Sequence, residues 1–278
     1  MAELKTEKKR SPIAYSCYFT GNREGEQFVP EHVFSYQISG TLTVNTGDAA
    51  FVFNEGDFRF IRRNQLLKFN KQPPPGGVFK SVSIYLDQDV LRSLSMETGY
   101  KAEPDKKQEA DAVMSLSGGP LYKSFMDSLL PYVENDQLIN NQLETLKQRE
   151  AIMILLQSRP ELKNLLFDFS EPGKIDLEAF MNKNFHFNVQ MKRFAYLTGR
   201  SLATFKRDFE SIFRSSPGRW LQQRRLQEAY YLIKEKGRKA SDVYLELGFE
   251  DLSHFSFAFK KSYGIPPSRL TGGNGYAP

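Results

Sequence analysis

Short apolar runs alternate with turn residues in the first part of the chain. From about residue 28 to 86, the runs FSYQIS, TLTVN, AAFVF, FRFIR and VFKSVSIYL are separated by glycine-rich, asparagine-rich or proline-rich turns. Several short strands at this spacing favour an all-β sandwich or barrel. The segment PPPGG at 73–77 lacks the N–H donors that a central strand needs, so we expect a stiff loop there. We predict a β-barrel over about 28–86.

Apolar residues recur at helical spacings after this region. The stretches DQDVLRSLSMET, LYKSFMDSLLPYV and NQLETLKQREAIMILLQSRPELKNLLFDF predict helices over about 87–168. Two interpretations stay open for them, packing on the barrel or on each other, and a homodimer contact through residues 137–168. The segment FSEPGK at 169–174 combines proline, glycine and charge and predicts a linker. Residues 1–12 predict a disordered tail, so the two predicted domains are 13–168 and 175–278.

The second predicted domain contains an internal repeat. Written 50 residues apart, SLATFKRDFESIFRSSPGRW at 201–220 and DLSHFSFAFKKSYGIPPSRL at 251–270 align without gaps. Phenylalanines at 255, 257 and 259 alternate as in a strand, but Phe255 and Phe259 match Phe205 and Phe209, which are four residues apart as on a helix. The repeat therefore predicts that both segments are helices with a buried aromatic stripe, which Leu202 extends in the first copy.

Each copy has the layout of a helix-turn-helix. A short helix at about 189–197 or 241–247 leads into Gly199 or Gly248, and glycine readily adopts the left-handed conformation of a tight turn. Ser201 and Asp251 then stand where an N-cap accepts from free backbone amides. In a helix-turn-helix the second helix enters the major groove of DNA.

A long helix predicted over Pro217–Lys236 connects the copies. Its length of roughly 30 Å approaches the ~34–36 Å rise of one DNA turn, so it could place two reading helices in successive major grooves. A helical bundle that arose by internal duplication and binds no DNA is the alternative.

Charge and composition narrow the classes of protein. The formal net charge is +5, yet residues 174–270 hold 18 Lys and Arg against 10 Asp and Glu. This asymmetry indicates a polyanion-binding module joined to a near-neutral one. The single cysteine, Cys17, excludes an internal disulfide framework. Without an apolar run behind its basic N-terminus or a stretch of about 18 apolar residues, the chain is expected to be cytoplasmic and to contact no membrane.

The C-terminal repeat resembles the DNA-binding domain of the AraC/XylS family of bacterial transcription regulators. The runs RRLQEA and ELGFEDLSHFSFAFKKSYG and the paired prolines carry the resemblance over about 175–270. Tyr244 and Phe257 depart from the family pattern, which has alanine and a polar or basic residue there. The resemblance implies a regulator, more often an activator, that binds double-stranded promoter DNA and contacts RNA polymerase. It also implies a cupin-like front domain that senses a small-molecule effector, binds a protein partner or mediates dimerisation, and an α+β fold.

A helical wheel separates the residues predicted to read bases from the buried stripe. In the first copy the outward set is Ala203, Thr204, Lys206 and Arg207, and in the second it is Ser253, His254, Ser256 and Phe257. Arg207 suits guanine, because a guanidinium bonds bidentately to O6 and N7, and Phe257 suits a thymine methyl. Packing of Phe257 on a neighbouring surface is the alternative. Candidate phosphate contacts are Arg200, Arg214, Arg219, Arg224, Lys260, Lys261 and Arg269.

The sequence predicts no catalytic site, no metal and no cofactor. His32, His186 and His254 are far apart, whereas a metal-dependent cupin enzyme needs clustered histidines. Neither a phosphate-binding loop nor a dinucleotide-binding glycine motif is present. Two alternatives to a sequence-specific regulator remain, a cupin-type enzyme with a DNA-binding appendage and a nonspecific architectural DNA-binding protein.

Overall fold

The computed structural model describes residues 11–23, 28–103, 111–134 and 140–270. The chain divides into two compact units at Ser170 and Glu171, and Phe28 and the short segment 66–68 group with the second unit. The predicted linker at 169–174 spans this division. The predicted tail at 1–12 lies outside the described residues, except for Ser11 and Pro12.

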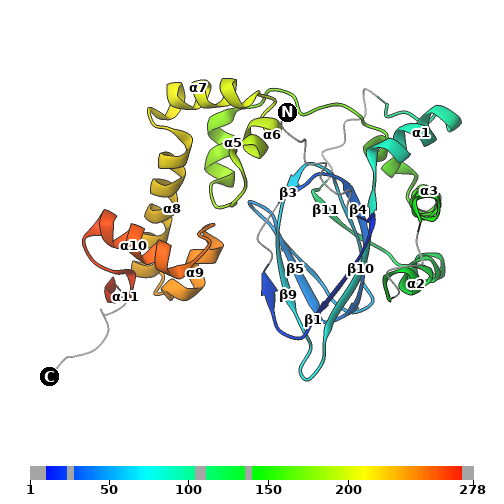
Figure 1. The fold of residues 1–278 in the computed structure, drawn as a ribbon, viewed down its shortest axis with the longest axis horizontal. Helices are drawn as coiled ribbons and strands as arrows, with labels where there is room; N and C mark the ends of the chain where they lie inside the picture. The colour runs from blue at the N-terminus through cyan, green and yellow to red at the C-terminus, as the bar shows by residue number, and fades with distance from the viewer. Residues whose placement is uncertain (1–10, 24–27, 104–110, 135–139, 271–278) are drawn as a thin grey trace, which may run out of the picture. The chain divides into compact units, whose positions relative to one another are not determined.

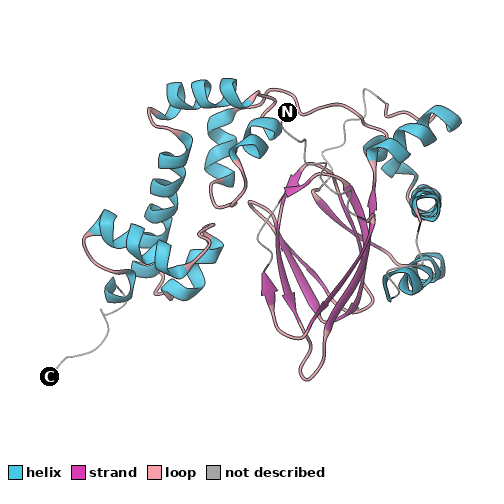
Figure 2. Cartoon of the chain, in the orientation of Figure 1, coloured by secondary structure: helices cyan, strands magenta, loops and turns pink. Residues whose placement is uncertain are grey.

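All strands of the described residues precede residue 117, and they form three sheets (Figures 1 and 2). The five-stranded sheet has the order β1-β10-β4-β7-β11, the four-stranded sheet β2-β9-β5-β6, and β3 pairs with β8. The strands are β1 (Ile13–Tyr18), β2 (Asn22–Arg23), β3 (Phe28–Val29), β4 (His32–Ser39), β5 (Thr41–Asn45), β6 (Ala50–Phe53), β7 (Phe58–Ile61), β8 (Gln65–Leu66), β9 (Lys68–Gln72), β10 (Phe79–Leu86) and β11 (Val113–Leu116).

The predicted limits of the β-rich region, 28–86, need two corrections. β1 and β2 precede them, and β11 lies inside the stretch predicted to be helical. β11 has only four residues, VMSL, which is too short for a periodic pattern, and it is a strand because it pairs with β7. The loop predicted at 73–77 is confirmed, since it joins β9 to β10.

The alternation of β4 and β10 separates two faces of the five-stranded sheet. On one face Ser35 lies opposite Ser83, and their hydroxyl oxygens are 2.8 Å apart. On the other face Phe34, Val82 and Ile84 are fully buried. They belong to one apolar core with the helices that follow.

Those helices are α1 (Gln88–Thr98), α2 (Pro120–Glu134), α3 (Asn141–Ser158) and α4 (Lys163–Leu166), with a short 3-10 helix at Pro160–Leu162. Ile152 and Leu155 of α3 are fully buried in the shared core, which confirms that these helices pack on the sheet and on each other. Leu146 and Met153 of α3 are exposed. The homodimer contact stays a prediction.

The C-terminal unit is helical from Leu177 to Leu270 (Figure 2). Its helices are α5 (Leu177–Asn184), α6 (Met191–Leu197), α7 (Leu202–Phe213), α8 (Pro217–Lys234), α9 (Ala240–Glu246), α10 (Leu252–Tyr263) and α11 (Pro267–Leu270). One core holds the fully buried rings of Phe205, Phe209, Phe255 and Phe259. The predicted α+β fold, a β-rich N-terminal region with helices and an all-α C-terminal region, is confirmed. Among the described helices, none has the length and apolar character needed to span a bilayer.

Candidate nucleic-acid interface

Two helix-turn-helix units, α6–α7 and α9–α10, repeat the same backbone geometry. Gly199 and Gly248 have φ angles of 64° and 82°, the left-handed conformation predicted for them. A Cβ at Gly199 would lie 2.3 Å from the carbonyl carbon of Gly173, and one at Gly248 would lie 2.6 Å from the carbonyl oxygen of His186. Only glycine fits, because backbone occupies the space of a side chain.

Both second helices begin at the predicted N-caps. The hydroxyl of Ser201 accepts from the backbone N–H of Thr204 at 3.2 Å, and the carboxylate of Asp251 accepts from that of His254 at 2.6 Å. The caps fix where α7 and α10 start and therefore which side chains face outward.

The predicted reading residues of α7 lie on the side opposite its buried rings. Ala203, Lys206 and Arg207 are exposed and Thr204 is half-buried, while Phe205 and Phe209 have no exposed surface. The Arg207 side chain is 77% exposed. The outward surface of α7 therefore presents two neighbouring cations, Lys206 and Arg207.

The corresponding surface of α10 has a different chemistry. Ser253 and His254 are exposed, Ser256 is half-buried, and Phe257 is 71% exposed. The predicted buried stripe needs one correction, because Leu202 is 41% exposed. Leu202 is the first residue of α7, immediately after its N-cap.

Most of the predicted phosphate contacts are accessible. Arg214, Arg219, Lys260, Lys261 and Arg269 are exposed. Arg224 is half-buried, with its guanidinium 3.1 Å from the carboxylate of Glu228 and over the ring of Phe185.

Arg200 differs from the other predicted phosphate contacts, because only 6% of its side chain is exposed. Its guanidinium donates to the backbone oxygens of Thr198 and Ile175 and to the carboxylate of Asp208. This burial favours a structural role for Arg200 over contact with a phosphate. Asp208 in turn has a lowered pKa, mainly because it accepts this hydrogen bond from Arg200.

Sequence reasoning missed Arg225. Its guanidinium donates to the backbone oxygens of Phe185, Phe187 and Gly248 at 2.7–2.9 Å and so ties α8 to the second turn. Burial lowers the pKa of Arg225 to about 10, so it remains a cation at neutral pH. Its spacing could have indicated this burial, because Arg225 lies four residues after the buried Leu221 and four before the buried Ala229, on the same side of α8.

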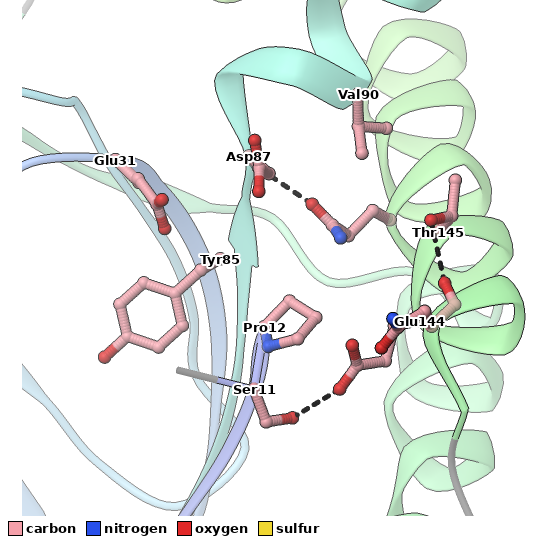
Figure 3. Close-up of a pocket in the computed structure, with 10 residues that line it drawn as sticks. Ser11, Pro12, Glu31, Tyr85, Asp87, Val90, Glu144 and Thr145 are labelled. Carbon is pink, nitrogen blue, oxygen red and sulfur yellow. Dashed lines mark hydrogen bonds between the residues drawn. The ribbon is translucent and has the colours of Figure 1, made fainter. Parts of the chain in front are cut away.

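The N-terminal unit contains a small polar cavity between the end of β10 and α3 (Figure 3). Its volume of about 190 Å³ is below the ~300–1,000 Å³ typical of ligand pockets. Internal hydrogen bonds occupy its lining, from the Ser11 hydroxyl to Glu144 at 3.0 Å and from the Asp87 backbone N–H to Gln148 at 2.8 Å. We therefore assign no effector to this cavity.

The histidines are not gathered into a metal site. His32 is buried in the N-terminal unit, and burial lowers its pKa to about 3, so its ring is neutral at pH 7. His186 and His254 belong to the C-terminal unit. Within the described ranges, no group of three His, Cys, Asp or Glu side chains could hold a metal ion.

Two family models match the chain, one in each unit. The model described as a helix-turn-helix domain matches residues 194–272, and that of the ExsA N-terminal regulatory domain matches residues 32–166. The chain belongs to the AraC/XylS family of transcription regulators. In this AraC/XylS protein, the match to the helix-turn-helix family model includes both copies of the repeat, at 201–220 and 251–270.

Individual relatives of this AraC/XylS chain include regulators of known name. It is 25% identical over 236 residues to the HTH-type transcriptional regulator ExsA of Pseudomonas aeruginosa, which covers 84% of this chain and 83% of that protein. It is 30% identical over 151 residues to the virulence regulon transcriptional activator VirF of Yersinia enterocolitica, which covers 49% and 56%. A crystal structure of apo ToxT from Vibrio cholerae aligns over 95% of this chain and 98% of that chain, with a TM-score of 0.43 and 12% identity.

Proposed function

We propose that this protein is a sequence-specific transcription regulator that inserts α7 and α10 into successive major grooves of promoter DNA. The observation that carries the proposal is the repeated presentation of an outward face, at the same positions of two helix-turn-helix units, opposite a packed aromatic core. The predicted base readers on these faces are Ala203, Thr204, Lys206, Arg207, Ser253, His254, Ser256 and Phe257.

The connecting helix supports two simultaneous insertions. Near its start, the Trp220 ring packs on Phe209 and Phe213 of α7, with ring centres 5.5 and 4.5 Å apart. Ten residues later, the Tyr230 ring packs on Phe259 and Tyr263 of α10. Helix α8 has 18 residues and a length of about 27 Å, which is comparable to one DNA turn of ~34 Å.

The two faces read different bases in this proposal. Arg207 is the reader of a guanine, through a bidentate hydrogen bond to O6 and N7. Phe257 is the reader of a thymine methyl, because its exposed ring has no hydrogen bond to offer. The exposed cations Arg214, Arg219, Lys260, Lys261 and Arg269 contact phosphates and make binding salt-dependent.

The N-terminal unit controls the DNA-binding unit in this proposal. Its match to a regulatory domain supports this assignment, and the name of the relative VirF favours activation over repression. RNA polymerase, a protein or small-molecule signal for the N-terminal unit, and a second copy of the chain are the proposed partners. The proposed place of action is the cytoplasm, where bacterial promoter DNA lies. We propose no enzymatic activity.

Selection of bound genomic fragments followed by sequencing tests the proposal. We expect a shared site, with protection of two adjacent major grooves on one face of the duplex at moderate salt. Binding without a preferred site would favour an architectural DNA-binding protein instead. Metal analysis of the purified protein tests the enzyme alternative, because a stoichiometric catalytic metal would support a cupin-type enzyme.

A further inference from the structure

The segment that enters the C-terminal unit lies against the first helix-turn-helix. The backbone of Gly173 occupies the space beside Gly199, where any side chain would collide with it. The Arg200 guanidinium donates to the backbone oxygen of Ile175 at 3.0 Å and to that of Thr198 at 2.7 Å. Arg200 therefore joins the entering segment to the turn that precedes the recognition helix α7.

The same arginine holds a carboxylate beside the reading face. Arg200 Nε donates to Asp208 Oδ2 at 3.1 Å, and Lys174 Nζ lies 3.7 Å from that oxygen. The other oxygen, Asp208 Oδ1, lies 3.6 Å from the guanidinium of Arg207. Because Arg200 is almost fully buried, it fixes the carboxylate in place, and the carboxylate then faces a freely exposed reader.

The second helix-turn-helix lacks this chain of contacts. Fifty residues on, Ala258 stands in the place of Asp208, and Glu250 stands in the place of Arg200. Ala258 is buried, and Glu250 accepts from the side-chain amide of Asn188. The carboxylate is therefore specific to the unit whose reading face carries an arginine.

A long, exposed arginine loses rotamer freedom when it binds a base. A fixed carboxylate on one edge of the guanidinium restricts its orientation before DNA arrives, and leaves the other edge for a guanine. An exposed ion pair of this kind adds little to the stability of the fold. Its effect is expected on the orientation of Arg207.

We propose that Asp208, held by Arg200, is a positioning residue that orients Arg207 for guanine. This inference rests on the proposed function, since it needs Arg207 to read a base. It assigns to Arg200 an indirect part in DNA recognition, through Asp208 and not through a phosphate.

The experiment compares two duplexes bound by the full-length protein. One carries a site selected from genomic DNA, and the other carries the same site with the guanine replaced at the position where Arg207→Ala abolishes preference. Asp208→Asn keeps an acceptor oxygen for Arg200 and removes the charge that faces Arg207. The measured quantity is the Kd for the duplex with the replaced guanine divided by the Kd for the selected duplex. We expect Asp208→Asn to lower this ratio roughly 2- to 5-fold, as for the loss of an exposed ion pair. Binding to an unrelated duplex is expected to stay equal or become tighter, because a negative charge is lost.

Three further variants separate positioning from a general effect. Asp208→Glu retains the carboxylate and is expected to restore at least part of the discrimination. Glu210→Gln removes a charge from the same helix outside these contacts and should leave the ratio unchanged. In an Arg207→Ala background, Asp208→Asn should have no further effect on the ratio.

Equal weakening on both duplexes, or an unchanged ratio in Asp208→Asn, would overturn the inference while leaving sequence-specific binding intact. A specific site at which Arg207→Ala loses no base preference would overturn it too. If the unaltered protein selects no site at all, the proposed function itself fails.

Discussion

Arg207 points outward from α7, and Phe257 occupies the equivalent place on α10. Around these two residues the units agree in helix lengths, left-handed turn glycines, N-caps and buried aromatic pairs. The difference teaches that packing constrains only one side of each recognition helix. The outward side is exposed or half-buried and has no core to match, so the two outward faces differ in chemistry on the same backbone geometry.

The largest expected effect tests whether the aromatic cores of the two helix-turn-helix units contribute equally to stability. Phe205→Ala and Phe255→Ala each remove a fully buried ring and are expected to lower the free energy of unfolding by about 3–5 kcal/mol. Urea titration followed by fluorescence of Trp220, the single tryptophan, reports on the C-terminal unit. Phe257→Ala is the matched control and should change stability by less than about 0.5 kcal/mol. A small loss for only one of the two core variants would break the equivalence.

The next effect concerns the turn glycines. Alanine in a left-handed conformation costs about 1–2 kcal/mol, and at Gly199 and Gly248 it also collides with backbone. Gly199→Ala and Gly248→Ala should therefore each cost at least about 2 kcal/mol of stability. Gly237→Ala is the control, because Gly237 has a φ of 64° with open space around it. Equal losses at all three positions would show that the close approach contributes nothing.

The reading faces are compared by binding to single-base variants of a selected site. Arg207→Ala should lose about 1–3 kcal/mol of discrimination at one guanine. Phe257→Ala should lose preference for a thymine in the other half of the site. Uniform weakening on every sequence would make Arg207 a phosphate contact. An unchanged base preference with lowered stability would assign Phe257 to packing.

The smallest expected effect lies at the ends of the recognition helices. The C-cap residue that follows α10 is Gly264, with a φ of 77°, whereas the one that follows α7 is Arg214, with a φ of 52°. Arg214→Gly relieves the cost of holding a non-glycine residue in the left-handed conformation, but glycine also raises the entropy of the unfolded chain. We expect the net free energy of unfolding to rise by about 0.5–1 kcal/mol. Urea titration without DNA measures it, since Arg214 is also a candidate phosphate contact. A loss of stability would mean that the Arg214 side chain contributes more than its backbone costs.

The fold was predictable wherever pattern and repeat agree. The copies 50 residues apart indicated the helices, the turn glycines, the caps and the aromatic core together, because each depends on local sequence. The strand β11 was not predictable, since four residues set no period and its conformation comes from pairing with β7. Leu202 was misplaced for a related reason, because a helical wheel gives a direction and not what covers it. The burial of the Arg200 side chain was not predictable either, because its acceptors on Ile175 and Asp208 meet it only in the folded unit.

By itself the sequence determined the two helix-turn-helix units and the residues on their outward faces, since helical periodicity, glycine and capping residues act over a few positions. Only the tertiary structure decided what the buried arginines bind. Arg200 looks like a surface cation in the sequence, and the spacing of Arg225 indicates the buried side of α8 without naming a partner, yet both bind backbone oxygens inside the C-terminal unit. The physical reason is that a buried guanidinium needs several acceptors, and these come from segments far apart in the chain that meet only in the folded protein.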